Sequence, residues 1–144
     1  MIEIKNLCFK YHSQTENTLQ NINLNIKKGE FVSIIGPSGC GKSTLCLTLN
    51  GIIPKTISGF FSGDVIIDGI NTKDGEVSEF SKKVGMILQN PESQLFAMTV
   101  EEELAFGPEN LAVPRKEIEE RISWALSVVN MENKRDELPG NLSG

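Results

Sequence analysis

The sequence predicts an α/β fold for these 144 residues, on three observations. Apolar and polar residues alternate before position 30, which is the period of half-buried strands. An apolar run at 31–35 leads into a glycine-rich loop and then into a stretch that reads as a helix, at 42–49. From Pro91 onward the apolar residues follow helical spacing. We therefore expect a core at 1–90 and a helical subdomain at 91–144.

The strands of the core follow one another along the chain. Residues 2–5 and 22–26 alternate in polarity and predict two half-buried strands. Residues 63–69 predict a short strand that ends in an Asp-Gly turn. Apolar runs at 31–35 and 84–88 predict two buried strands.

The aspartate of that turn has a second interpretation. An aspartate that follows an apolar strand helps to hold Mg²⁺ in many phosphate-loop enzymes. The apolar run before Asp68 is only three residues long, however, and Gly69 follows at once. We therefore favour a turn role for Asp68.

Two helices are expected in the second half. Thr99 with Glu102 three residues later is a capping-box signature, and this helix is expected to end near Gly107-Pro108. Pro114 opens the next helix, and Trp124 on it is interpreted as partly buried packing rather than a platform for a ligand. Its apolar residues at helical spacing are Ile118, Ile122, Ala125, Leu126 and Val129.

The loop at 36–43 matches the phosphate-binding pattern G-x-x-x-x-G-K-[ST] at every fixed position. Glycine has no side chain and adopts positive φ without strain, so its glycines let the backbone wrap closely around a polyphosphate. A glycine-rich turn with a chance Lys-Ser is the alternative, which the preceding apolar run disfavours. The loop residues are Gly36, Pro37, Ser38, Gly39, Cys40, Gly41, Lys42 and Ser43.

The helix that follows directs charge at the same anion. Its first-turn N–H groups and the positive end of its dipole face the loop. Lys42 adds a full charge for the β- and γ-phosphates, the Ser43 hydroxyl is placed to ligate Mg²⁺, and Thr44 can donate to the α-phosphate. We expect ATP or ADP with Mg²⁺ as the ligand.

Composition argues against several other classes of protein. A formal net charge of −5 and an isoelectric point near 4.9 disfavour a nucleic-acid-binding surface over the whole chain. No run approaches the roughly 18 apolar residues of a membrane span, and the first residues lack the layout of a secretory signal. Three cysteines without metal-ligand spacing favour reduced thiols in a cytosolic compartment. Cys40 is either a reactive thiolate, favoured by the helix N-terminus, or a thiol tolerated at a variable position.

Further motifs resemble the nucleotide-binding subunit of an ATP-binding cassette (ABC) transporter. They are, in order, Phe9-Lys10-Tyr11, residues 24–30, the phosphate loop, Gln89 and Leu142-Ser143-Gly144. Within that family, the stretches at 50–54, 89–96 and 99–110 resemble the energy-coupling factor transporters, which import vitamins and metal ions such as cobalt or nickel. The resemblance implies a P-loop NTPase core with an N-terminal antiparallel β subdomain, a C-terminal α-helical subdomain and an incomplete parallel sheet.

The resemblance also implies roles for single residues. Tyr11 matches the aromatic residue that stacks on adenine, with an ordinary strand-end tyrosine as the alternative. Gln89 matches the glutamine that contacts Mg²⁺ and the attacking water. Ser143 and Gly144 match the signature motif, which contacts the γ-phosphate bound to the other subunit of a head-to-tail dimer. The catalytic candidates are then Lys42 and Gln89, and the metal-binding candidates are Ser43 and Gln89.

The family further implies a transmembrane transporter subunit as partner, a peripheral position on the cytoplasmic face of the membrane, and ATP hydrolysis coupled to transport. Phe96 and Phe106 are candidate contacts for that partner, although such residues are more often simple core. The 144 residues stop inside the signature motif and lack the later magnesium-binding aspartate, the catalytic glutamate and the switch histidine. We therefore expect them to bind nucleotide but to hydrolyse it poorly. Because the parallel sheet is incomplete, we also expect self-association or marginal stability.

Two other functions remain open on the sequence alone. One is a regulatory module that binds nucleotide without catalysis. The other is a small-molecule kinase, which would use the same loop but would need a second substrate pocket and basic lid residues. Arg115, Arg121 and Arg135 are available for such a lid, although solvent-facing positions explain them more simply.

Overall fold

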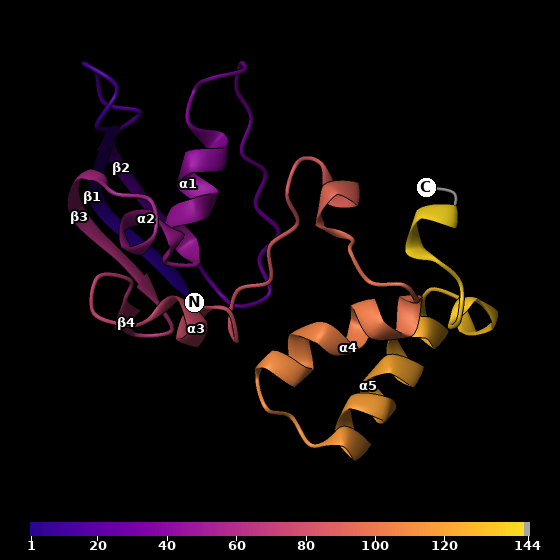
Figure 1. The fold of residues 1–144 in the computed structure, drawn as a ribbon. Coiled ribbons are helices and arrows are strands. Elements are labelled where there is room, and N and C mark those ends of the chain that lie inside the picture. The colour runs from indigo at the N-terminus through magenta and orange to yellow at the C-terminus, as the bar shows by residue number, and fades with distance from the viewer. Residues whose placement is uncertain (143–144) are drawn as a thin grey trace. The chain divides into compact units, whose positions relative to one another are not determined.

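A computed structural model describes residues 1–142 of the chain, and Figure 1 shows its course. Its internal contacts divide the chain into two units, Met1–Met86 and a second unit that begins at Ile87. Each unit has its own hydrophobic core and is described by itself.

The first unit contains a four-stranded antiparallel sheet in the order β2-β1-β3-β4. Its strands are β1 (Ile2–Tyr11), β2 (Leu19–Ile26), β3 (Gly59–Ile67) and β4 (Ile70–Asn71). The central strand, β1, pairs Ile4 with Leu24 of β2 and with Val65 of β3. The alternating stretches of the sequence are thus confirmed as strands, which run further than expected.

A tight turn joins β3 to β4. Asp68 and Gly69 both have positive φ, at 47° and 84°, as the central residues of a type I′ hairpin turn require. The Asp68 carboxylate accepts a hydrogen bond from the Met1 ammonium at 2.6 Å, and this bond and charge lower the pKa of Asp68. The structure therefore supports the turn role of Asp68.

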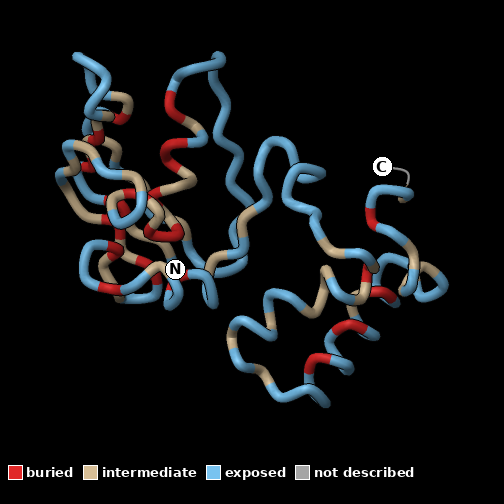
Figure 2. The backbone as a smooth tube through the Cα atoms, viewed as in Figure 1, coloured by how far each residue is buried: buried red, intermediate tan, exposed pale blue. Residues whose placement is uncertain are grey.

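Three helices accompany this sheet: α1 (Lys42–Leu49), α2 (Ile52–Lys55) and α3 (Val77–Phe80). Helix α1 begins and ends where the sequence predicts, with Asn50 as its C-cap and Gly51 at a φ of 75°. Figure 2 shows buried residues in α1 and in the strands β1 and β3. The core that they share contains Ile4, Leu7, Phe9, Leu19, Leu45, Ile53, Val65, Ile67 and Phe80.

The prediction of two buried strands is wrong for the described residues. Neither 31–35 nor 84–88 belongs to a strand, and Phe31 and Ile35 are 98% and 90% exposed. A parallel strand is stable inside a sheet that is covered on both faces, and no described residue pairs with either run. These apolar runs therefore remain unpaired backbone here.

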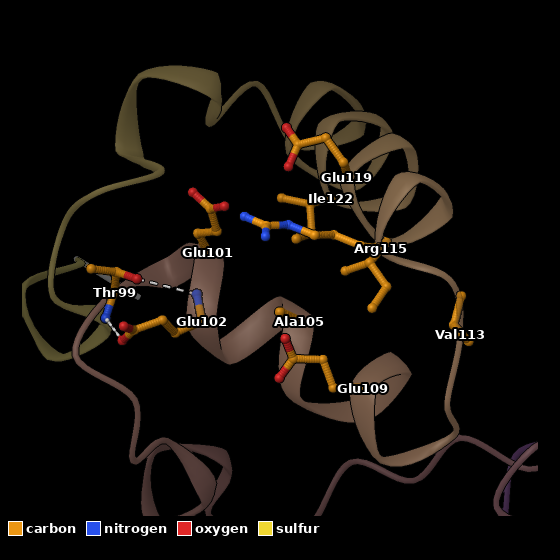
Figure 3. A pocket seen from close by; sticks show the side chains of 10 residues that line it. Thr99, Glu101, Glu102, Ala105, Glu109, Val113, Arg115, Glu119 and Ile122 are labelled. Atoms are coloured by element: carbon orange, nitrogen blue, oxygen red, sulfur yellow. Dashed lines mark hydrogen bonds between the residues drawn. The ribbon is translucent and has the colours of Figure 1, made fainter.

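The second unit is helical, with α4 (Val100–Asn110) packed against α5 (Arg115–Val128). Short 3₁₀ turns occur at Pro91–Gln94, Glu132–Lys134 and Pro139–Asn141. The predicted capping box at the start of α4 is present: Glu102 N donates to Thr99 Oγ1, and Thr99 N donates to Glu102 Oε2, each at 3.1 Å (Figure 3). Pro114 precedes α5 as predicted.

Three details of these helices differ from expectation. Helix α4 continues past Gly107 and Pro108 to Asn110, because Leu111 N still donates to Gly107 O and Pro108 O. Trp124 and Val129 are 68% and 58% exposed, because the buried face of α5 follows a four-residue spacing. That face consists of Ile118, Ile122 and Leu126. Within residues 1–142, no helix combines the length and the apolar character that a membrane span requires.

Candidate functional site

The phosphate loop connects the exposed run 31–35 to α1, and its glycines occupy positions that other residues fit poorly. Gly39 and Gly41 have φ values of 82° and 95°. A Cβ on Gly41 would lie 2.7 Å from Thr18 O, and a Cβ on Gly36 would lie 2.7 Å from Cys40 Sγ. The loop geometry therefore depends on glycine at positions 39 and 41, whereas at Gly36 the obstacle is only the exposed Cys40 side chain.

Helix α1 offers its N-terminus to the loop. Gly41 is the N-cap residue, and no side chain caps the helix. The first N–H group that is bonded within the helix is that of Leu45, which donates to Gly41 O at 2.8 Å. Lys42, Ser43 and Thr44 form the first turn, so their N–H groups and the helix dipole are directed at this end.

The Lys42 ammonium lies across the loop. Lys42 Nζ donates to Gly36 O at 2.9 Å and to Pro37 O at 2.7 Å. Its third close contact is the exposed Cys40 thiol, with Nζ 3.6 Å from Sγ. A full positive charge is thus centred on the same backbone turn that the glycines shape, and the Ser43 side chain beside it is exposed to solvent.

Tyr11 links the end of β1 to the first turn of α1. Its hydroxyl is 3.0 Å from Thr44 Oγ1, and Thr44 itself is buried. The half-buried Tyr11 ring packs edge-on against Phe9, with ring centroids 4.8 Å apart and planes at 80°. Sequence reasoning missed this contact because nothing in the spacing of residues 11 and 44 indicates it.

The segment between β1 and β2 also borders the loop. Residues 13–18 line a hollow of about 550 Å³ together with Gly39 and Cys40. Thr18 approaches Gly41 closely from the same segment. Sequence reasoning gave this polar stretch no role, and its lack of apolar residues between two strands was the only signal available.

The other candidate residues belong to the second part of the chain, from Ile87 onward. Gln89 is exposed in the second unit, in the unpaired stretch that precedes Pro91. Phe96 and Phe106 are both exposed and pack edge-on against each other, with centroids 4.6 Å apart. Ser143 and Gly144 lie outside the described residues.

Comparison with known proteins identifies the class of protein to which this fold and loop belong. Residues 19–144 match the ABC transporter family, so the chain is a member of that family. A putative ABC transporter ATP-binding protein of Pyrococcus horikoshii is 57% identical over all 144 residues, which cover 51% of that protein. The energy-coupling factor transporter ATP-binding protein EcfA of Methanocaldococcus jannaschii is 45% identical, with 100% of this chain and 50% of that protein covered.

Solved structures agree with this membership. CbiO1 of Clostridium perfringens, part of the ABC transporter complex cbiONQ, superposes with a TM-score of 0.82 at 31% identity, over 99% of this chain and 55% of that one. An ATP-binding cassette in a dimeric post-hydrolysis state, bound to ADP and Pi, gives a TM-score of 0.78 at 31% identity, over 99% and 63%. The fold is therefore that of ABC ATPases, and the chain spans about half the length of the curated relatives named above.

Proposed function

We propose that this chain is the nucleotide-binding part of an ABC transport ATPase of the energy-coupling factor type. The observation that carries the proposal is the loop at 36–43, where the Lys42 ammonium and the first turn of α1 converge on one glycine-lined turn. This is the arrangement that binds a polyphosphate. The relatives named as transporter ATP-binding proteins support the coupling to transport.

Each group at the loop has a proposed task. The Lys42 ammonium exchanges its carbonyl partners for the β- and γ-phosphates, and the N–H groups of Ser43 and Thr44 donate to phosphate oxygens. The exposed Ser43 hydroxyl ligates Mg²⁺, which takes few protein ligands and neutralises phosphate charge. Tyr11 offers its ring to adenine, and the hollow beside residues 13–18 gives space for the nucleoside.

The second unit carries the proposed contacts with other subunits. A hollow of about 550 Å³ there is lined largely by apolar residues, among them Phe96, Met98 and Leu142. This surface, the exposed Phe106 and the Gln89 segment are the proposed contacts with a transmembrane subunit. Gln89 would also contact Mg²⁺ and the attacking water, and Ser143 and Gly144 the γ-phosphate held by a second ATP-binding subunit. The complex would lie on the cytoplasmic face of the membrane and power the import of a vitamin or metal ion.

The 144 residues are proposed to bind nucleotide far better than they hydrolyse it. Phosphoryl transfer needs metal-holding and water-orienting groups in addition to a phosphate cradle. The full-length protein, with such groups, is proposed to be the ATPase.

The experiment that tests this proposal is a titration with a fluorescent ATP analogue in Mg²⁺, with phosphate release followed in the same samples. Lys42→Ala removes a charge-assisted hydrogen bond worth roughly 1.5–3 kcal/mol and is expected to weaken binding about 10- to 100-fold. Lys55→Ala is the matched control, because Lys55 is an exposed lysine at the end of α2, away from the loop. Its affinity should equal that of the unsubstituted chain.

The possible results separate the alternatives. Saturable binding that Lys42→Ala weakens, without turnover, supports the proposal. Equal affinity for all three proteins contradicts the phosphate-loop site, and transfer of phosphate to a small acceptor would favour the kinase instead.

A further inference from the structure

The second unit contains an ion network that the phosphate loop does not use. Arg135 Nε donates to Glu101 Oε2 at 2.6 Å, and Arg135 Nη2 donates to Glu101 Oε1 at 2.9 Å. The same Nη2 donates to both carboxylate oxygens of Glu119, at 2.6 and 2.7 Å. Because Glu101 lies on α4 and Glu119 on α5, one half-buried guanidinium ties the two helices together.

The backbone around Arg135 is fixed to α4 as well. Val100 N donates to Glu137 O and Glu101 N donates to Arg135 O, each at 3.0 Å. These N–H groups belong to the first turn of α4, which has no partners for them within the helix. The stretch 135–137 therefore caps α4 with its carbonyl groups while the Arg135 side chain holds the carboxylate beside them.

The far end of the same segment is held by packing. Pro139 is buried, the 3₁₀ turn Pro139–Asn141 follows, and Leu142 packs against the core of Val100, Ile118, Ile122 and Leu126. Segment 135–142 is thus attached to α4 and α5 at both ends. In the sequence it leads directly to Ser143 and Gly144.

The attachment at the Arg135 end combines the backbone hydrogen bonds to α4 with the charge of the Arg135 side chain. Figure 3 shows Glu101 and Glu119 projecting toward each other from α4 and α5, with the Arg115 guanidinium directed between them. They line a hollow of about 720 Å³ that also contains Glu102 and Glu109. Without Arg135, Glu101 and Glu119 would lose the guanidinium that bonds to both of them, and the nearby Arg115 charge would offset only part of their repulsion. The helices and the segment they hold would then be free to move.

We propose that Arg135 is a positioning residue for the ATPase reaction. By joining segment 135–142 to both helices, it fixes the part of the chain that precedes Ser143 and Gly144, the proposed contacts with the γ-phosphate on a second subunit. This inference rests on the proposed function. It adds a residue that contacts neither nucleotide nor metal and acts only through the segment it anchors.

The test uses the full-length protein and compares Arg135→Ala with Arg121→Ala. Arg121 is a matched control, because it is an exposed arginine of α5 whose Nη2 pairs with Glu117 on that helix. Among the described residues it forms no hydrogen bond or ion pair with segment 135–142. We expect Arg135→Ala to lower kcat about 10-fold or more while the affinity of the phosphate loop for a fluorescent ATP analogue changes less than about twofold. Arg135→Lys should recover part of the rate, because a lysine ammonium can pair with Glu101 or Glu119 but lacks the planar guanidinium that bonds to both.

Hydrogen exchange supplies a readout independent of activity. The amides of Val100 and Glu101 should exchange faster in Arg135→Ala and remain unchanged in Arg121→Ala, because only the former loosens their acceptors. If Arg135→Ala does not fold, Glu119→Gln replaces it and should lower kcat by a smaller factor, because it weakens only one arm of the network.

Three results overturn the inference: an unchanged kcat in Arg135→Ala, an equal loss in Arg121→Ala, or a parallel loss of nucleotide affinity. An unsubstituted full-length protein that binds ATP without hydrolysing it would instead contradict the proposed function, which separates the two failures.

Discussion

Lys42 and Tyr11 fix the junction between the loop and α1 from two sides. The lysine bonds to the carbonyl oxygens of Gly36 and Pro37, and the tyrosine bonds to Thr44 in the first turn of the helix. The loop pattern alone predicts Lys42, the glycines and the start of α1. The Tyr11 contact depends on how β1 packs against α1, so no local pattern contains it.

Tyr11 has an observed contact with Thr44 and a proposed contact with adenine, and two substitutions distinguish them. Tyr11→Phe removes the hydroxyl bonded to Thr44, so it should lower the free energy of unfolding by about 1 kcal/mol and leave ATP affinity unchanged. Tyr11→Ala also removes the ring and should weaken binding of ATP but not of inorganic triphosphate, which has no base to stack. Competition titrations against the fluorescent analogue measure both affinities. Equal weakening of ATP and triphosphate would contradict the adenine role.

At the scale of elements, two glycines allow the backbone conformation that the sheet requires, one within β3 and one in the turn that follows it. Gly63 and Gly69 share a φ of 84°. A Cβ on Gly63 would lie 2.5 Å from Lys5 O on β1, at the point where the β1–β3 register shifts, whereas a Cβ on Gly69 meets nothing within 4 Å. A substitution at Gly69 therefore measures only the cost of positive φ, whereas one at Gly63 adds the cost of a steric clash.

Alanine at these two positions should have unequal effects. Gly69→Ala should lower the free energy of unfolding by about 1 kcal/mol, because only the positive φ is unfavourable. Gly63→Ala should cost about 2–4 kcal/mol, because the added methyl group also forces β1 and β3 apart. Urea unfolding at 25 °C measures both, and similar losses would show that the close approach of β1 is not maintained in solution.

The sequence predicts elements well where their stabilisation is local. Helix α1, the capping box of α4, and the Asp68-Gly69 turn follow from residues close together in the chain. The runs 31–35 and 84–88 have the composition of buried strands, but a strand also needs a neighbour, and composition does not supply one. Trp124 is exposed rather than partly buried for a related reason, since an apolar residue on a helix is buried only if another element covers it.

At the scale of the whole molecule, both units depend on ionised carboxylates. Hydrogen bonds from Lys73 and Asn71 lower the pKa of Asp64 in the first unit, and Arg135 lowers the pKa of Glu101 in the second. A carboxyl whose pKa is lowered on folding stabilises the fold at pH values above its pKa in the unfolded chain. That stabilisation is lost as the pH falls through the pKa of the carboxyl in the folded protein.

The stability of the chain should therefore be constant from pH 7 to about 5 and should decrease below about 4, near and under the ordinary pKa of these groups. Asp64→Asn tests the cause. The stability difference between the unsubstituted chain and this variant should be present at pH 7 and should shrink as Asp64 becomes protonated. Urea midpoints across pH measure the difference; one that persists unchanged at pH 2.5 would rule out the charge of Asp64 as its source.

The exposed run 31–35 also determines where the chain can be cut. A protease binds its substrate as an extended strand, and Phe31 is a fully exposed aromatic side chain on unpaired backbone between β2 and the phosphate loop. Chymotrypsin should therefore cleave after Phe31 early, separating the first hairpin from α1. If residues 31–35 pair as a strand of a parallel sheet, the same peptide bond is protected. The rate of this single cleavage therefore reports whether a strand has formed immediately before the phosphate loop.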